Sequence, residues 1–315
     1  MVNNQINILL LGGAKRVSLA ERFIASAKTL GYEVNIFSYE LEKYVPILAV
    51  GEVIIGLRWK DEKIFEHLTQ IIHQKNIHIV LPFLDAATIT AAILKDKLKD
   101  KHIFFPVSDE NVCTAFFNKS NANQWFINHG FPVPHQNLQD FPLIAKPING
   151  SASQGIQKLE NQAELVDFLL KYEPEKYLIQ QFIEGDEYSV DCYVDDFGET
   201  LSIIPRKRIE TIGGEVSKSV TKRLENLIEI SAEIIKKANF RGPITIQFLQ
   251  KKSQAYLMEI NPRFGGGVIT SIEAGGDIPM MILKDFLKIK NEKVNDWKEN
   301  LLMMRTNREF FFEIT

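Results

Sequence analysis

Short apolar runs alternate with amphipathic segments in the first third of the chain, and this alternation restricts the fold more than any other feature of the sequence. The apolar runs read as strands at residues 6–11, 33–38, 50–55, 77–81 and 103–105. Helices are expected between them, beginning at Ser18, Asp61 and Asp85. Strands that alternate with helices form a parallel, doubly wound sheet, so an α/β region is predicted.

The turn after the first strand contains Gly12 and Gly13 but does not follow the GxGxxG pattern of dinucleotide-binding folds. No acidic residue ends the second predicted strand, where a ribose would be held. We therefore interpret the two glycines as a tight strand-to-helix turn rather than as a dinucleotide site.

A stiff connector separates this region from the rest of the chain. Residues 108–129 have a helical pattern that breaks near Asn118 and Lys119, and Gly130, Pro132 and Pro134 then end it. Beyond the connector, hairpin turns join most of the strands, which predicts an α+β region. The strands expected there are residues 143–146, 177–183, 188–194, 201–204, 243–249 and 255–261, with helices at 162–171 and 224–238.

Composition excludes several classes of protein. The chain has 315 residues, of which 45% are hydrophobic and 24% charged, and its net charge is −3. A wide nucleic-acid-binding face is therefore not expected. Cys113 and Cys192 lie far apart and read as reduced core thiols. No signal peptide and no apolar stretch of membrane-spanning length is recognised, so a cytoplasmic location away from membranes is expected.

A predicted hairpin brings oxygen-bearing side chains together. Glu259 and Asn261 alternate on one strand and share a face, while Gln247 lies on the partner strand within about a residue of Glu259. A set of oxygen ligands with few charges suits Mg²⁺, because this ion also binds substrate phosphates. Arg263 follows and can meet an anion, and the glycines 265–267 would let the backbone approach a ligand.

Two further segments suggest a nucleotide. Lys146 ends an apolar strand and precedes a loop of small residues, 149–155, which can surround phosphate oxygens with donors. The loop is not a Walker A motif, because the lysine precedes the small residues. Glu187 begins another strand and can hold a diol such as a ribose, whereas Glu184 and Asp186 read as a solvated turn.

In this order the motifs resemble the ATP-grasp superfamily, and among its branches the carbamoyl-phosphate synthase large-subunit-like proteins. The features that carry the resemblance are the strand ending in Lys146, the small-residue loop, the apolar segment before Gly-Asp-Glu at 185–187, and Gln247 followed by Glu259-x-Asn261-x-Arg263. The order of these motifs is specific, although no single motif is.

The resemblance implies a fold for nearly the whole chain. Residues 1–115 would form a Rossmann-like pre-ATP-grasp domain of the α/β class. Residues 116–183 would form the small ATP-grasp subdomain with the phosphate loop, and residues 184–315 the large subdomain with the metal site. Residues 301–312 resemble the closing strand of the large subdomain.

The resemblance also implies roles for individual residues. The two lysines would bind ATP phosphates, 150–155 would cover the β- and γ-phosphates, 180–183 would meet adenine through backbone groups, and Glu187 would hold the ribose. The ATP-binding set is Lys119, Lys146, Gly150, Ser151, Ser153, Gly155, Gln180, Gln181, Phe182, Ile183 and Glu187. Gln247, Glu259 and Asn261 match the metal ligands, and Arg263 the phosphate-contacting arginine, which with Lys146 forms the implied catalytic pair.

Two positions depart from the family pattern. The superfamily often has an acid where this chain has Asn118 or Gln180. The amides alter the polarity near the hinge, but nucleotide binding is still expected.

The basic segment 205–218 is predicted to border the acceptor site. Arg206 and Arg208 share a strand face by alternation, and similar segments lie beside the acceptor in this branch. Exposed basic residues at strand ends are also common. We favour a substrate role, with Arg208 binding a carboxylate or a phosphate.

Together these features predict an ATP- and Mg²⁺-dependent ligase, in which Mn²⁺ can replace Mg²⁺. A small-molecule carboxylate would be phosphorylated, and an amine would then displace phosphate. One alternative is a carbamate or small-molecule kinase of the same fold, and another is an ATP-binding regulatory subunit without catalysis. The sequence leaves a homodimer open and does not identify the substrates.

Overall fold

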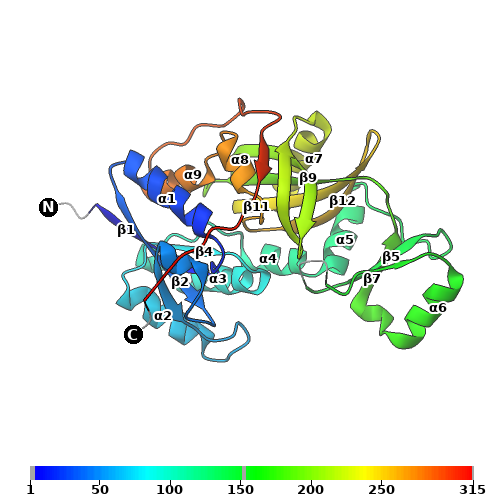
Figure 1. Cartoon of the computed structure of the whole chain (residues 1–315), viewed down its shortest axis with the longest axis horizontal. Coiled ribbons are helices and arrows are strands. Elements are labelled where there is room, and N and C mark those ends of the chain that lie inside the picture. The colour runs from blue at the N-terminus through cyan, green and yellow to red at the C-terminus, as the bar shows by residue number, and fades with distance from the viewer. Residues whose placement is uncertain (1–3, 151–153, 314–315) are drawn as a thin grey trace.

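The protein contains three sheets. The computed structural model describes residues 4–150 and 154–313, and within them the sheets have four, six and three strands. Figure 1 shows the four-stranded sheet at the N-terminal end, the six-stranded sheet in the middle and the three-stranded sheet at the far end. No helix in these ranges has both the length and the apolar character that crossing a membrane requires.

The N-terminal sheet is parallel, as the alternation predicts. Its strand order is β3-β2-β1-β4, and each hydrogen-bonded pair runs in the same direction. The strands are β1 (Gln5–Leu11), β2 (Glu33–Glu40), β3 (Glu52–Ile55) and β4 (Ile79–Pro82), and the helices are α1 (Val17–Thr29), α2 (Ile64–Gln74) and α3 (Asp85–Lys97).

Two details of this sheet differ from prediction. Residues 103–105 form only an isolated bridge, in which Phe104 pairs with Ile79, because the segment is too short for a ladder. The helix α1 begins at Val17 instead of being capped by Ser18, and its N-cap residue is Arg16, whose side chain makes no capping hydrogen bond.

Two helices lead from the N-terminal sheet to the rest of the chain. They are α4 (Glu110–Phe117) and α5 (Lys119–Asn128), and the predicted break falls between them. Asn118 caps α5, because its side-chain oxygen accepts hydrogen bonds from the backbone N–H groups of Ser120 and Asn121. This cap explains why an amide is favourable at the break.

The three-stranded sheet has the order β6-β5-β7 and is antiparallel. Its elements are β5 (Leu143–Pro147), β6 (Gln157–Leu159), α6 (Gln162–Lys171) and β7 (Tyr177–Gln181). Leu143, Ala145, Leu159, Leu165 and Phe168 form a small buried core of their own.

The six-stranded sheet is antiparallel, with the order β12-β11-β8-β9-β10-β13. Its strands are β8 (Asp186–Val194), β9 (Thr200–Ile212), β10 (Glu215–Thr221), β11 (Gly242–Lys251), β12 (Gln254–Asn261) and β13 (Leu302–Met304). The helices α7 (Glu225–Ala238), α8 (Ile269–Glu273) and α9 (Ile278–Phe286) complete this part, and the short 3-10 turns are Pro46–Ala49, Lys99–Lys101 and Pro174–Lys176. β9 continues well beyond the predicted 201–204, and the closing strand is much shorter than 301–312.

The N-terminal sheet and the six-stranded sheet share one hydrophobic core. Phe23 of α1 and Phe83 pack in the same cluster as Tyr193, Phe264 and Ile282 from the C-terminal half. Rings of Phe83 and Phe264 stack with centroids 5.7 Å apart. These two sheets are therefore joined by buried apolar packing, unlike the three-stranded sheet with its separate core.

Candidate active site

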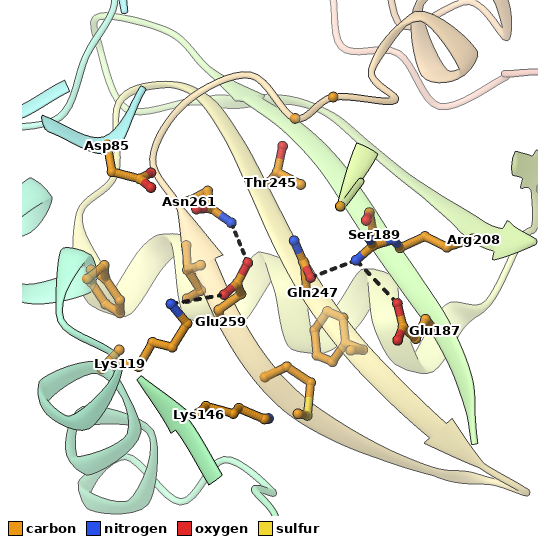
Figure 2. Close-up of a pocket in the computed structure, with 18 of the residues that line it drawn as sticks. Asp85, Lys119, Lys146, Glu187, Ser189, Arg208, Thr245, Gln247, Glu259 and Asn261 are labelled. Atoms are coloured by element: carbon orange, nitrogen blue, oxygen red, sulfur yellow. Dashed lines mark hydrogen bonds and ion pairs between the residues drawn. The ribbon is translucent and has the colours of Figure 1, made fainter. Parts of the chain in front are cut away.

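A cavity of about 500 Å³ lies where the three sheets meet. Its size is typical of small-molecule sites. The helix α3 beside the N-terminal sheet contributes Asp85, the three-stranded sheet Lys146, and the six-stranded sheet Glu187, Gln247 and Glu259. Figure 2 shows these side chains pointing toward one another from different elements.

One face of the six-stranded sheet forms the polar wall of this cavity. Gln247 lies directly opposite Glu259 in the β11–β12 ladder, and Ser189 lies opposite Gln247 in the β8–β11 ladder. The predicted register is therefore confirmed. Alternation then places Asn261 and Thr245 on the same face, one row further along.

The predicted metal ligands are close together and held by neighbouring groups. Asn261 Nδ2 donates a hydrogen bond to Glu259 Oε1 at 3.0 Å. Lys119 Nζ lies 3.9 Å from Glu259 Oε2. One carboxylate and two amide oxygens fit Mg²⁺, because this ion keeps several waters and binds through few protein charges. Glu259, Asn261 and Gln247 would hold it here.

The two predicted ATP lysines lie on the same side of Glu259. Figure 2 shows Lys119 and Lys146 next to each other beside this carboxylate. Lys119 Nζ also donates to the backbone oxygen of Gly150 at 2.7 Å. Burial lowers the pKa of Lys146 to about 8, Glu259 opposes this shift, and the charge of Lys119 adds to it. Lys146 is therefore a poorly solvated cation that an anion would stabilise.

The phosphate loop is only partly described. Ser151 and Ser153 lie outside the described residues. Gly150 and Gly155, at either end of the loop, have φ values of 119° and 75°, which side chains with a Cβ rarely adopt. Gly150 also lines the cavity. Glycine is thus required by the backbone at both positions.

The hinge at 180–183 is held in place by its own hydrogen bonds. Gln180 is buried, and its Nε2 donates to Asn123 Oδ1 at 2.8 Å and to the Pro134 oxygen at 3.2 Å. The amide therefore serves packing between α5 and β7. Backbone N–H groups of Gln181 and Phe182 donate to the oxygens of His135 and Pro142. These two N–H groups already have hydrogen-bond acceptors within the protein. The adenine contact predicted for 180–183 would therefore use other backbone groups of this segment.

Arg208 lies between the predicted ribose acid and the predicted metal ligands. Its Nη1 donates to Gln247 Oε1 at 2.9 Å and lies 3.3 Å from Glu187 Oε2. Figure 2 shows Arg208 on the Glu187 side of the wall, away from Asp85. These contacts place the Arg208 guanidinium beside Glu187 and Gln247, which are themselves predicted to bind the ribose and the metal, and its acceptor role stays a prediction.

Arg206 lines the same cavity but is buried. Its side chain is only 1% exposed, and its Nε donates to Asp191 Oδ2 at 2.7 Å. A Cβ on Gly267 would lie 2.6 Å from Arg206 Nη1, and one on Gly265 would lie 2.7 Å from Thr245 Oγ1. Arg206 thus packs as a buried side chain against the glycine segment, and its substrate role stays a prediction. The lack of a side chain at these two glycines leaves room for Arg206 and Thr245.

Arg263 is oriented by helix α3 of the N-terminal region. Its Nε donates to Asp85 Oδ1 at 2.6 Å, and its Nη2 donates to Asn261 Oδ1 at 3.1 Å. Asp85 lies in the first turn of α3. Sequence reasoning could not identify this partnership, because the two residues are 178 positions apart.

Asp191 is a second residue that sequence reasoning missed. It accepts hydrogen bonds from Arg206, Thr245 and Ser271 and is 1% exposed. The alternation Glu187, Ser189, Asp191 along β8 is a recognisable polar face and could have identified it.

Known proteins share this architecture and parts of its sequence. A family model described as "ATP-grasp in the biosynthetic pathway with Ter operon" matches residues 173–309. The carbamoyl phosphate synthase large chain of Caldanaerobacter subterraneus is 32% identical over 223 residues, 63% of this chain and 20% of that protein. The D-alanine–D-alanine ligase of Aquifex aeolicus is 24% identical over 278 residues, 81% of this chain and 88% of the ligase.

Solved structures resemble nearly the whole chain. The biotin carboxylase domain of Hydrogenobacter thermophilus 2-oxoglutarate carboxylase, in complex with MgADP, ADP and bicarbonate, matches with a TM-score of 0.75 at 16% identity, covering 94% of this chain and 73% of that chain. The L-amino acid ligase of Bacillus licheniformis matches with a TM-score of 0.68 at 19% identity, covering 90% of this chain and 74% of that chain. At such identities the likeness shows the fold alone.

The fold and the arrangement of the cavity agree with what the sequence comparisons find. Residues 173–309 match an ATP-grasp domain, and the chain is similar to a carbamoyl phosphate synthase large chain and to a D-alanine–D-alanine ligase. It spans about a fifth of the carbamoyl phosphate synthase large chain that it matches.

Proposed function

We propose that the protein is an ATP- and Mg²⁺-dependent ligase that joins a carboxylate to an amine and releases ADP and phosphate. The observation that carries the proposal is the convergence of Lys119, Lys146 and Arg263 on the oxygen row Gln247, Glu259 and Asn261 in one cavity. Phosphoryl transfer depends on positioning and on charge stabilisation, and these groups supply both.

The two ends of the cavity would bind different parts of the nucleotide. Residues 180–183 and Glu187 would hold adenosine, with Arg208 keeping Glu187 in place. Lys119 and Lys146 would bind the phosphates, and burial of Lys146 strengthens its attraction for them. Mg²⁺ on the Glu259 side would offset negative charge on the phosphates.

The reaction would proceed in two transfers. A carboxylate oxygen of the acceptor attacks the γ-phosphorus, and the bond from that phosphorus to the ADP oxygen breaks. The amine nitrogen then attacks the acyl carbon, phosphate leaves, and the nitrogen loses a proton to form the amide. Arg263 lies next to Asn261 and would neutralise the transferred phosphoryl oxygens.

We further propose the division of the chain that the resemblance implies. Residues 1–115 would be the Rossmann-like pre-ATP-grasp domain, 116–183 the small subdomain and 184–315 the large subdomain. The parallel N-terminal sheet supports the first assignment, and the separate core of the three-stranded sheet supports the second. The protein would be compatible with a homodimer.

ADP release tests the reaction. The protein is incubated with Mg·ATP and pooled carboxylates, with and without pooled amines. ADP formation that requires both pools supports a ligase. ADP formation with carboxylates alone indicates a kinase, and tight ATP binding without turnover with any pool would contradict an enzymatic role.

Isotope transfer tests the intermediate. With ¹⁸O in the acceptor carboxylate, one labelled oxygen is expected in the released phosphate. Unlabelled phosphate from a competent substrate pair would contradict the acyl phosphate, and AMP among the products would indicate adenylation instead.

A further inference from the structure

Arg16 has a charge that its surroundings do not balance. It lies in the turn between β1 and α1, lines the cavity, and its side chain is 18% exposed. Its nearest carboxylate oxygen in the described part of the chain is Oε1 of Glu215, at 3.9 Å, which is beyond hydrogen-bonding distance. A largely buried guanidinium is costly unless an anion accepts its hydrogen bonds.

The neighbouring acids are committed to other arginines. Glu215 Oε2 accepts a hydrogen bond from Arg305 Nη1 at 2.8 Å, and Arg305 Nη2 donates to the Gly266 backbone oxygen at 2.5 Å. Asp85 accepts from Arg263 at 2.6 Å. Three guanidinium groups therefore face two carboxylates, and the surplus positive charge falls on Arg16.

The electrostatics of Arg16 agree with this count. Burial lowers the pKa of its guanidinium, Glu215 opposes that shift, and Arg263 and Arg305 add to it. Gly266 lies beside the Arg16 guanidinium, since a Cβ at this position would be in van der Waals contact with Arg16 Nη1, at 3.7 Å. As glycine has no Cβ, that position beside the guanidinium holds no side chain. An additional anion would stabilise the group.

Arg16 lies apart from the residues that we propose to bind the nucleotide. Glu187, Arg208 and Gln247 are linked by contacts at one end of the polar wall, and Glu259 and Asn261 follow. Arg16 lies beyond them, next to Arg263 and Gly266. An acceptor that places one carboxylate near Arg263 would extend toward Arg16.

We propose that Arg16 binds a second anionic group, a carboxylate or a phosphate, on the acceptor, so that the enzyme selects acceptors with two negative groups. The inference rests on the proposed ligase function and names its substrate class. A bidentate arginine contact with a carboxylate or phosphate is both strong and selective. Monoanionic acceptors would lack this contact.

The test compares four proteins: the wild type, Arg16→Gln, Arg16→Lys and Lys15→Gln. Lys15 is exposed in the same turn and is the matched control. With Mg·ADP present, thermal stabilisation is titrated with glutarate, 3-phosphoglycerate and butyrate at constant ionic strength. Glutarate and 3-phosphoglycerate distinguish a dicarboxylate from a phosphorylated carboxylate, and butyrate is the reference with a single anionic group.

One of the two compounds with two anionic groups is expected to stabilise the wild type and Lys15→Gln saturably and far better than butyrate. Arg16→Gln should weaken that binding by about ten-fold or more, and Arg16→Lys should restore part of it. Equal binding to the wild type and Arg16→Gln, or no preference over butyrate, would overturn the proposal.

Calorimetry with Mg·ATP and with AMP separates this outcome from the ligase function. Arg16→Gln should bind both nucleotides as the wild type does. Selective loss of ATP would place Arg16 at the nucleotide phosphates and overturn the inference. Failure of the wild type to bind ATP would instead contradict the ligase, whatever the anion titration shows.

Discussion

Replacing Lys146 with methionine should make the nucleotide-free protein more stable. Burial lowers the pKa of this lysine from 10.5 to about 8. At 1.36 kcal/mol per pKa unit, holding the charged form in the fold costs about 3 kcal/mol at pH 7. Methionine has a similar volume and no charge, so Lys146→Met removes this cost.

The gain should depend on pH in a defined direction. Between pH 8 and 10.5 the unfolded chain binds the proton of Lys146 more tightly than the folded chain does. The free energy of unfolding of the wild type therefore rises with pH through this window. Its difference from that of Lys146→Met should shrink to about 1 kcal/mol at pH 10.

Urea unfolding followed by tryptophan fluorescence at pH 7 and pH 10 measures both values. Lys236→Met, at an exposed site on α7, is the control and should change the free energy of unfolding by less than about 0.5 kcal/mol at either pH. A variant no more stable than the wild type at pH 7 would refute the reasoning. A gain that persists undiminished at pH 10 would assign the effect to apolar packing.

Glu259→Gln should abolish the Mg²⁺ dependence of nucleotide affinity and lower turnover by at least about 100-fold, measured by calorimetry and ADP release. Arg208→Ala should raise the KM for ATP more than that for the acceptor, because Arg208 contacts Glu187; the opposite ratio in steady-state kinetics would support the acceptor role predicted for Arg208. Asp191→Asn should lower the free energy of unfolding by about 3 kcal/mol, because it leaves the buried Arg206 charge uncompensated, and urea titration that shows no loss would contradict that support role.

Local sequence pattern predicted the parts of the fold that depend on neighbouring residues. The pairing of Gln247 with Glu259 follows from a hairpin with a short turn, in which alternation alone sets the face. The break before Lys119 follows from the capping preference of Asn118. Both were recoverable because the controlling interactions are near in sequence.

The extent of β9 could not be obtained in this way. Pro205 interrupts the pattern and suggests a strand end, yet it pairs with Val190 inside the ladder. Arg206 and Arg208, which follow it at alternate positions, line the cavity, so this part of β9 does not show the apolar alternation of a core strand. A strand that lines a site therefore looks like a loop in the sequence.

Contacts between residues that are far apart in the sequence could not be predicted from it either. Arg263 meets Asp85, and Arg16 approaches Glu215, only because the N-terminal sheet packs on the six-stranded sheet through a common core. Residue spacing carries no information about such docking. The burial of Arg206 against Asp191 has the same origin, since it depends on tertiary packing.

The separate core of the three-stranded sheet has a mechanical consequence. Lys146 belongs to this sheet, whereas Glu259 and Arg263 belong to the part fused by the larger core. Rotation of the small sheet outward would rehydrate Lys146 and remove the cost of burying its charge, so the nucleotide-free protein is expected to favour an open arrangement of this sheet. The phosphates of ATP would attract the same charge, so nucleotide binding would favour the closed arrangement.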